Sequence, residues 1–141
     1  MPDESTSELA HQWLEKATED REAARRLTDL PHVCSFHCQQ AVEKGIKALL
    51  VLREVEFART HDIDILLRQL GDQGLTPGHI DSEDLAALTR FAVDTRYPPE
   101  TSTTREAREA LDLAEQFLEW AKIQIRAVDS DGEERGGDER T

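Results

Sequence analysis

The chain has 141 residues, a formal net charge of −13 and 33% charged side chains. This length is enough for one domain whose core needs no disulfide or metal to hold it together. The negative charge argues against nonspecific DNA binding, because each phosphate contact needs a cation, and no apolar run approaches the ~20 residues of a membrane span.

The first predicted helix begins near Thr6 or Ser7, whose hydroxyl groups can cap free backbone N–H groups. Its expected buried stripe consists of Leu9, Trp13, Ala17, Ala24 and Leu27. Asp20 falls within this stripe, and a buried carboxylate needs a partner. The candidates are Lys44, Arg96 and His61, either in a polar cluster inside a cleft or in an ordinary ion pair at the margin of the core. Pro31 breaks the chain soon afterwards, so the first two helices should pack antiparallel after a short connection.

The second predicted helix, around residues 36–50, has two different faces. Its apolar face consists of Cys34, Cys38, Ala41, Val42, Gly45, Ile46, Leu49 and Leu52. The opposite face carries Phe36, Gln40, Glu43 and Lys47, with Gln39 and Lys44 at its borders. Glu43 and Lys47 have the i, i+4 spacing of an ordinary surface ion pair. The alternative is that this polar face contacts another molecule.

Three more helices are expected downstream. A short amphipathic helix contains Ile63, Leu66, Leu67 and Leu70, and a fourth helix begins at Ser82 and buries Leu85, Leu88, Phe91 and Ala92. The last helix covers residues 103–127, with a core stripe of Ala107, Ala110, Leu111, Ala114, Phe117, Leu118, Ala121 and Ile125. Leu113 and Trp120 lie beside that stripe and could widen the core or form an interface. Residues 128–141 lack apolar periodicity and are expected to be a disordered acidic tail. The predicted fold is an all-α, up-down bundle of four to five helices over residues 6–127.

Few residues indicate a catalytic, ligand-binding or metal-binding site. His61 lies near a predicted helix start, where it could hold a phosphate or move a proton, or only orient the loop. Cys34 and Cys38 point to the apolar side and His37 points elsewhere, so we expect no zinc site, no other metal and no cofactor. Two cysteines on one helix fit reduced thiols, and the N-terminus has no apolar signal-peptide segment. A cytoplasmic location is therefore expected.

Several motifs together resemble the HEPN domains, which are small all-helical proteins of bacteria and archaea. The run Phe36-His37-x-Gln39-Gln40-Ala41-Val42-Glu43-Lys44 resembles their second helix, and Ala17, Asp20, Ala24 and Leu27 resemble their first. Thr60-His61 and Arg96-Tyr97-Pro98 follow in the order seen in many relatives. The resemblance covers roughly residues 8–127. It implies a homodimer and suggests binding or interface roles for Asp20, Phe36, His37, Gln40, Glu43, Lys44, Lys47 and Tyr97.

The resemblance implies two kinds of function. Many HEPN domains are metal-independent RNases that use an arginine followed, after four to six residues, by a histidine. In this chain the corresponding positions after Arg96 are Thr101, Ser102 and Thr103, so the signature is not intact. Other members are partners of small nucleotidyltransferases, often in toxin–antitoxin pairs.

The hypothesis favoured by the missing histidine is a homodimeric interaction module for a nucleotidyltransferase or a nucleotide, in a toxin–antitoxin or stress-response context. The alternative is an RNase toxin that acts on RNA with Arg96 and His61. A structural bundle with merely solvated polar faces is a third possibility, and enzymatic activity stays open at this point.

Overall fold

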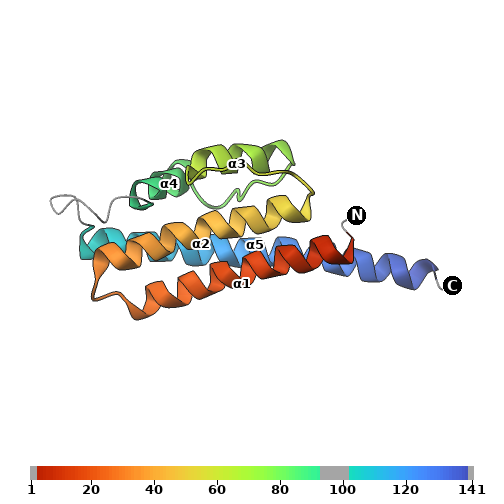
Figure 1. Ribbon diagram of the computed structural model, residues 1–141, viewed down its shortest axis with the longest axis horizontal. Helices are drawn as coiled ribbons and strands as arrows, with labels where there is room; N and C mark the ends of the chain where they lie inside the picture. Colours follow the sequence, from red (N-terminus) through yellow and green to blue (C-terminus); the bar gives the residue numbers. More distant parts are fainter. Residues whose placement is uncertain (1–2, 93–101, 140–141) are drawn as a thin grey trace.

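A computed structural model describes residues 3–92 and 102–139, with side-chain surroundings as far as Asp129 (Figure 1). The helices are α1 (Glu4–Arg26), α2 (Pro31–Leu52), α3 (Ile63–Asp72), α4 (Ser82–Ala87), the 3₁₀ helix η1 (Leu88–Phe91) and α5 (Thr104–Glu139). The part of the chain that is described contains no strand. The predicted all-α bundle is therefore confirmed.

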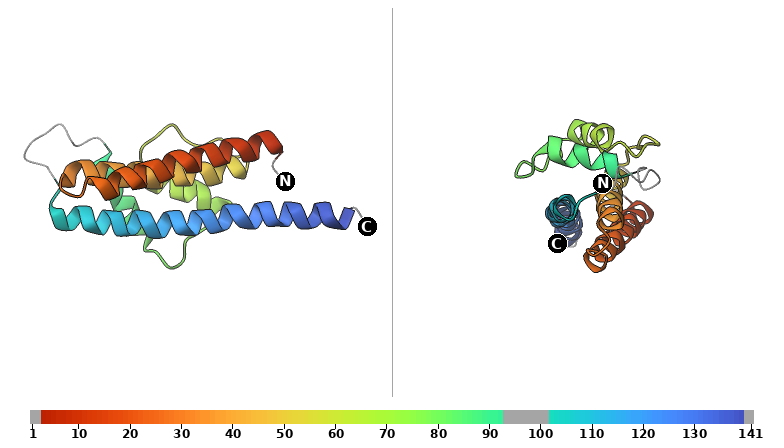
Figure 2. Two further views of the ribbon diagram at one scale, coloured as in Figure 1. Left: turned by 90° about the horizontal axis from the view of Figure 1, so that it is seen from below. Right: turned by 90° about the vertical axis from the view of Figure 1, so that its left-hand side faces the viewer.

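α2 lies at the centre of the bundle. α1 runs antiparallel to it, and α5 runs parallel to it after the chain has crossed over through α3 and α4 (Figure 1). Seen end-on, α3 and α4 lie across one side of α2, α1 lies on the opposite side, and α5 lies beside α2 (Figure 2). Because α2 is covered on both sides, most of its residues are buried, including the whole predicted apolar face.

The close contact between α1 and α2 uses alanines rather than large side chains. Ala10, Ala17 and Ala24 recur every seven residues and are fully buried. The prediction that Leu9 belongs to this stripe is wrong, since its side chain is 47% exposed. The neighbouring Ala10 takes the buried position instead, and its small side chain lets the two backbones approach.

Aspartates cap three of the helices. Asp3 accepts a hydrogen bond from the Thr6 N–H, so α1 begins before the expected Thr6 or Ser7. Asp62 caps α3, which places His61 in the preceding loop. Asp81 caps α4 in place of the expected Ser82. An aspartate carboxylate accepts from the free N–H groups as well as a serine does, and its charge is also favoured by the helix dipole.

α5 packs on α2 through its predicted stripe, all of which is buried except the half-buried Leu111. The closest approach is at Gly45, where an added Cβ would lie 2.9 Å from Phe117 Cε1. Trp120 is half-buried and lies against Phe117, with ring centroids 5.7 Å apart, so it widens the core.

The C-terminal part of α5 extends past the end of α1 and α2 (Figure 2). The helix continues to Glu139, beyond the predicted end at residue 127. The segment predicted as an acidic tail thus starts within the bundle, because Val128 packs against the core and Asp129 pairs with His11 of α1. None of the described helices combines the length and apolar character needed to span a membrane.

Candidate functional site

A half-buried carboxylate on α1, Asp20, holds two side chains of α2. Lys44 Nζ donates to Asp20 Oδ2 at 2.6 Å, and His37 Nδ1 lies 2.8 Å from Asp20 Oδ1. Only 12% of the Asp20 side chain is exposed. Lys44 is confirmed as the partner expected from the sequence, whereas His61 is not, because it pairs elsewhere.

A second carboxylate, Glu43 on α2, is buried and makes the same kind of cluster. Lys47 Nζ donates to Glu43 Oε2 at 3.0 Å, and His61 Nδ1 lies 2.9 Å from Oε1. Gln39 Nε2 donates to the same Oε1 at 3.1 Å. Burial alone would raise the pKa of Glu43, but these hydrogen bonds outweigh it and hold the pKa below its usual value. Glu43 is therefore ionised at neutral pH.

The glutamines connect the carboxylate to the loop before α3. Gln39 Nε2 also donates to the His61 carbonyl oxygen at 3.2 Å, and Gln40 Nε2 donates to Gln39 Oε1 at 2.7 Å. Gln39 is fully buried. The loop is thus tied to α2 through both the side chain and the backbone of His61.

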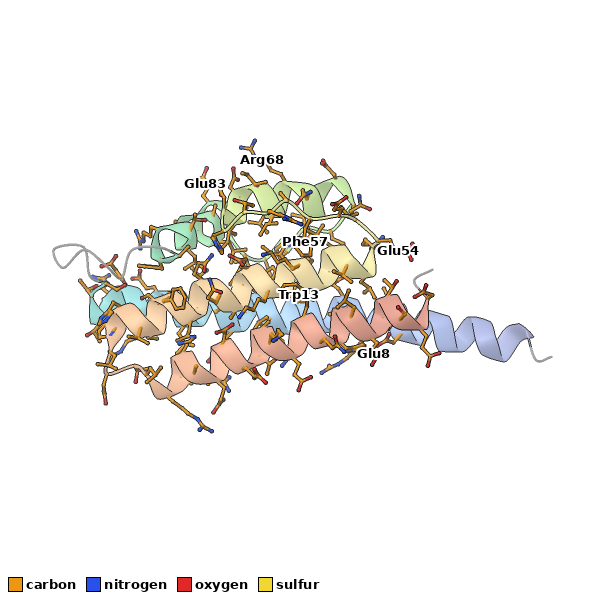
Figure 3. All side chains as sticks on the ribbon, viewed as in Figure 1. Glu8, Trp13, Glu54, Phe57, Arg68 and Glu83 are labelled. Carbon is orange, nitrogen blue, oxygen red and sulfur yellow. The ribbon has the colours of Figure 1, made fainter. Side chains whose placement is uncertain are left out.

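Two aromatic rings cover the Lys47 end of this cluster. Trp13 of α1 and Phe57 of the loop meet edge to face, with their ring centroids 5.6 Å apart. Both residues are labelled in Figure 3. Lys47 Nζ lies 5.6 Å from the Trp13 ring centroid and 5.1 Å from that of Phe57. These distances are within the range of cation–π attraction. The aromatic rings therefore shield the ammonium group from water.

The side chains left accessible above these buried groups form what we call the α2 polar face. It consists of Phe36, His37, Gln40, Lys44 and His61, each of which is half-buried or, for His61, exposed. Glu43 and Lys47 lie beneath it, with 4% and 11% of their side chains exposed. The interpretation of Glu43 and Lys47 as a surface ion pair is therefore wrong, since they form a buried one. Arg96 and Tyr97 lie outside the described residues.

Three contributors were not recognised from the sequence. Gln39 was placed only at the border of the polar side, Trp13 was assigned to the core, and Phe57 was not assigned at all. A pair of glutamines beside a glutamate was the available signal for Gln39. Nothing in the periodicity of α1 indicates that Trp13 meets a loop residue.

His61 has the arrangement of a general acid or base. An ionised carboxylate can only accept hydrogen bonds, so the contact with Glu43 places a proton on Nδ1. The His61 side chain is 64% exposed, which leaves Nε2 open to solvent. A carboxylate at Nδ1 orients the imidazole and fixes its tautomer, which suits proton transfer at Nε2.

The cysteines belong to the core. Burial raises the pKa of both the Cys34 and the Cys38 thiol, so both are protonated at neutral pH. Within residues 3–92 and 102–129, no group of three or more His, Cys, Asp or Glu side chains is positioned to hold a metal ion.

Comparison with known proteins identifies the family. The model of the family described as HEPN domain matches residues 10–124. The crystal structure of TT1696 from Thermus thermophilus is similar, with 31% identity and a TM-score of 0.70 over 81% of this chain and 96% of that one. The structure of ST0689, an archaeal HEPN homologue, is 26% identical with a TM-score of 0.60 over 82% of this chain and 97% of that one. No curated protein matches. The match over most of the chain and the shared all-helical fold show that this protein belongs to the HEPN domain family.

Proposed function

We propose that the protein is a homodimeric interaction module whose α2 polar face binds a nucleotidyltransferase partner or a nucleotide, in a toxin–antitoxin or stress-response context. The observation that carries the proposal is that the buried Glu43 and the half-buried Asp20 hold this face in position from below. Asp20 fixes His37 and Lys44, and Glu43 fixes His61.

Stability alone does not account for this arrangement. Apolar side chains of similar volume often stabilise a core as well as a buried ion pair does, because desolvating the charges offsets their attraction. The arrangement does give the donors and acceptors fixed positions. Such preorganisation lowers the entropy lost when a ligand binds.

The chemistry of the face suits a ligand with both charge and an apolar surface. The Lys44 ammonium has N–H donors beyond the one that it gives to Asp20, and the Gln40 carboxamide oxygen is left to accept because its Nε2 already donates to Gln39. Phe36 adds a half-buried aromatic ring that packs edge to face against His37 at 5.5 Å. A nucleotide phosphate and base, or an acidic partner surface with an apolar anchor, would match these groups.

The first test is assembly with a partner. The chain should sediment as a dimer and co-purify with a nucleotidyltransferase encoded beside its gene, or bind a nucleotide in calorimetry. Gln40→Ala and Phe36→Ala should each weaken partner binding about tenfold, since each removes one anchoring contact. Arg68→Ala is the matched control, because Arg68 lies on α3 with 79% of its side chain exposed and pairs only with Asp64 among the described residues. A strictly monomeric chain that binds neither partner nor nucleotide would contradict the proposal.

The Glu43–His61 pair favours a second candidate, a metal-independent RNase that uses His61 with Arg96. His61 would exchange the proton of the RNA 2′-hydroxyl, and Arg96 would neutralise the charge that develops on the phosphate. This candidate rests on the exposed Nε2 of a histidine whose Nδ1 is held by a carboxylate.

The RNase candidate makes a separate prediction. RNA cleavage by the dimer should fall at least about 100-fold in His61→Ala and in Arg96→Ala, which is the usual contribution of a general acid or base. His11→Ala is the control, because His11 also lies beside a carboxylate, Asp129, and is similarly exposed. Equal cleavage by all three variants, or none by the unaltered protein, would rule out this mechanism.

A further inference from the structure

A groove lies between η1 and the first turns of α5, away from the α2 polar face. We call it the η1–α5 groove; residues 84–91 of α4 and η1 line one side of it, and residues 106–113 of α5 line the other. Its volume is about 380 Å³, toward the lower end of the usual range for binding pockets. A space of this size takes one or two side chains of a partner rather than a whole domain.

The floor of the η1–α5 groove is apolar. Leu88 and Phe91 of η1 and Ala110 of α5 line it and belong to the buried core. Leu113 of α5 also lines it and is half-buried. An apolar side chain placed in the groove would therefore cover surface that is now in contact with water, which favours its binding.

The rim of the groove is acidic. Four carboxylates line it: Asp84, Glu106, Glu109 and Asp112. Among the described residues, Arg90 is the only cation that lines it, and Arg90 pairs with Glu106 at 3.2 Å. Within residues 3–92 and 102–129, Asp84 and Asp112 have no cationic partner. The rim therefore keeps an excess of negative charge.

Arg90 shows how a cationic side chain fits this groove. Its guanidinium carbon Cζ lies 4.7 Å from the centroid of the Phe91 ring, while its Nη2 contacts Glu106 of α5. Long cationic side chains commonly lay their aliphatic stems on apolar surface and keep the charged end beside a carboxylate or water. The rest of the floor, together with Asp84 and Asp112, offers the same combination to a side chain from another molecule.

We propose that the η1–α5 groove docks a basic amphipathic segment of a partner protein. A lysine or arginine of that segment would pair with Asp84 and Asp112, and a neighbouring apolar side chain would pack against Leu113. Charge complementarity determines the choice of partner, because the rim and the chain as a whole, with a net charge of −13, attract basic surfaces and repel acidic ones. The apolar floor favours a protein segment over a small hydrated cation.

The docking is tested with the full chain and a labelled synthetic peptide of about 12 residues, or three helical turns, with lysines on one face and leucines on the other. Fluorescence anisotropy at low salt should show saturable binding that weakens as salt is added. A peptide with glutamate in place of lysine should not bind. Spermidine, which has cationic groups but no apolar side chain, should compete at least about tenfold more weakly than unlabelled peptide.

Substitutions in the groove test where the peptide binds. Asp84→Asn and Asp112→Asn should each weaken binding about threefold, which is typical of one exposed charge pair, and together about tenfold. Ala87→Trp should weaken it at least about tenfold, because the indole fills the groove while every charge is kept. Glu83→Gln is the matched control, since Glu83 is the neighbour of Asp84 in the first turn of α4 but does not line the groove. All four altered side chains are exposed, so the fold should be retained, which circular dichroism checks.

Four results would overturn this assignment. These are no saturable peptide binding at ~1 mM, equal binding of the acidic peptide, equal losses in Glu83→Gln and Asp84→Asn, and competition by spermidine as strong as that by the peptide, which would indicate a free polyamine instead. The groove shares no residue with the α2 polar face. Gln40→Ala should therefore leave peptide binding unchanged, and failure of one surface is distinguishable from failure of the other.

Discussion

Glu43→Ala is expected to lower the free energy of unfolding by about 3–5 kcal/mol, which is the usual effect of removing one partner of a buried ion pair. The substitution leaves the Lys47 ammonium beneath Trp13 and Phe57 without its counterion. It also removes the acceptor for His61 and Gln39. Chemical denaturation followed by circular dichroism measures the change.

A double substitution provides the control for this prediction. Glu43→Leu combined with Lys47→Met removes both charges together, so no buried ion is left unpaired and most of the lost stability should return. If the single and double variants were equally unstable, the loss would come from packing rather than from the stranded charge. A change below about 1 kcal/mol in Glu43→Ala would show that the pair is accessible to water in solution.

The same carboxylate makes stability depend on pH. Because its pKa is lowered in the folded protein, Glu43 stabilises the fold by its full amount at pH values above the unfolded glutamate pKa of about 4.3. Below that pH the unfolded chain binds a proton before the folded protein does. The stabilisation is therefore lost as the pH falls toward the pKa of Glu43 in the folded protein. The stability difference between the unaltered protein and Glu43→Gln should therefore be largest near pH 7 and shrink below about pH 4.

Gly45→Val is expected to destabilise the protein by about 2–3 kcal/mol, because overpacking forces neighbouring side chains to move. The added Cβ would lie 2.9 Å from Phe117 Cε1 and 3.0 Å from Leu118 Cδ2, and both neighbours are fully buried. The additional methyl groups of valine worsen these contacts between α2 and α5. Thermal unfolding should show a clearly lower midpoint.

Gly71→Val is the matched control for this substitution. Gly71 also lies within a helix, but nothing lies within 4 Å of the position of its added Cβ. The free energy of unfolding of this variant should change by less than about 0.5 kcal/mol, because valine and glycine differ little in helix propensity. If both variants lost the same amount of stability, the α2–α5 contact at Gly45 would not be the cause of the loss.

Helical periodicity was sufficient to predict most of the core. The stripes of α3 and α5 follow the i, i+3, i+4 spacing and are buried or half-buried as expected. The error at Leu9 has a specific cause. Both Leu9 and Ala10 fit the periodicity of α1, and only the close approach of α2 decides which of them is buried.

The α2 polar face could be predicted only in part. Periodicity showed that Gln40, Glu43 and Lys47 share a side of α2, but it could not show what covers that side. The loop between α2 and α3 brings His61 and Phe57 over it, and loop paths depend on tertiary contacts that leave no periodic pattern. Glu43 was therefore taken for a surface residue although it is buried.

The contact between Trp13 and Phe57 has a consequence for how ligand binding can be observed. The chain has two tryptophans, and the Trp13 indole touches the same loop that carries His61. Any ligand that shifts this loop changes the surroundings of that indole and hence its emission. The protein thus carries an intrinsic fluorescent reporter, and Trp120→Phe would isolate its signal without an attached dye.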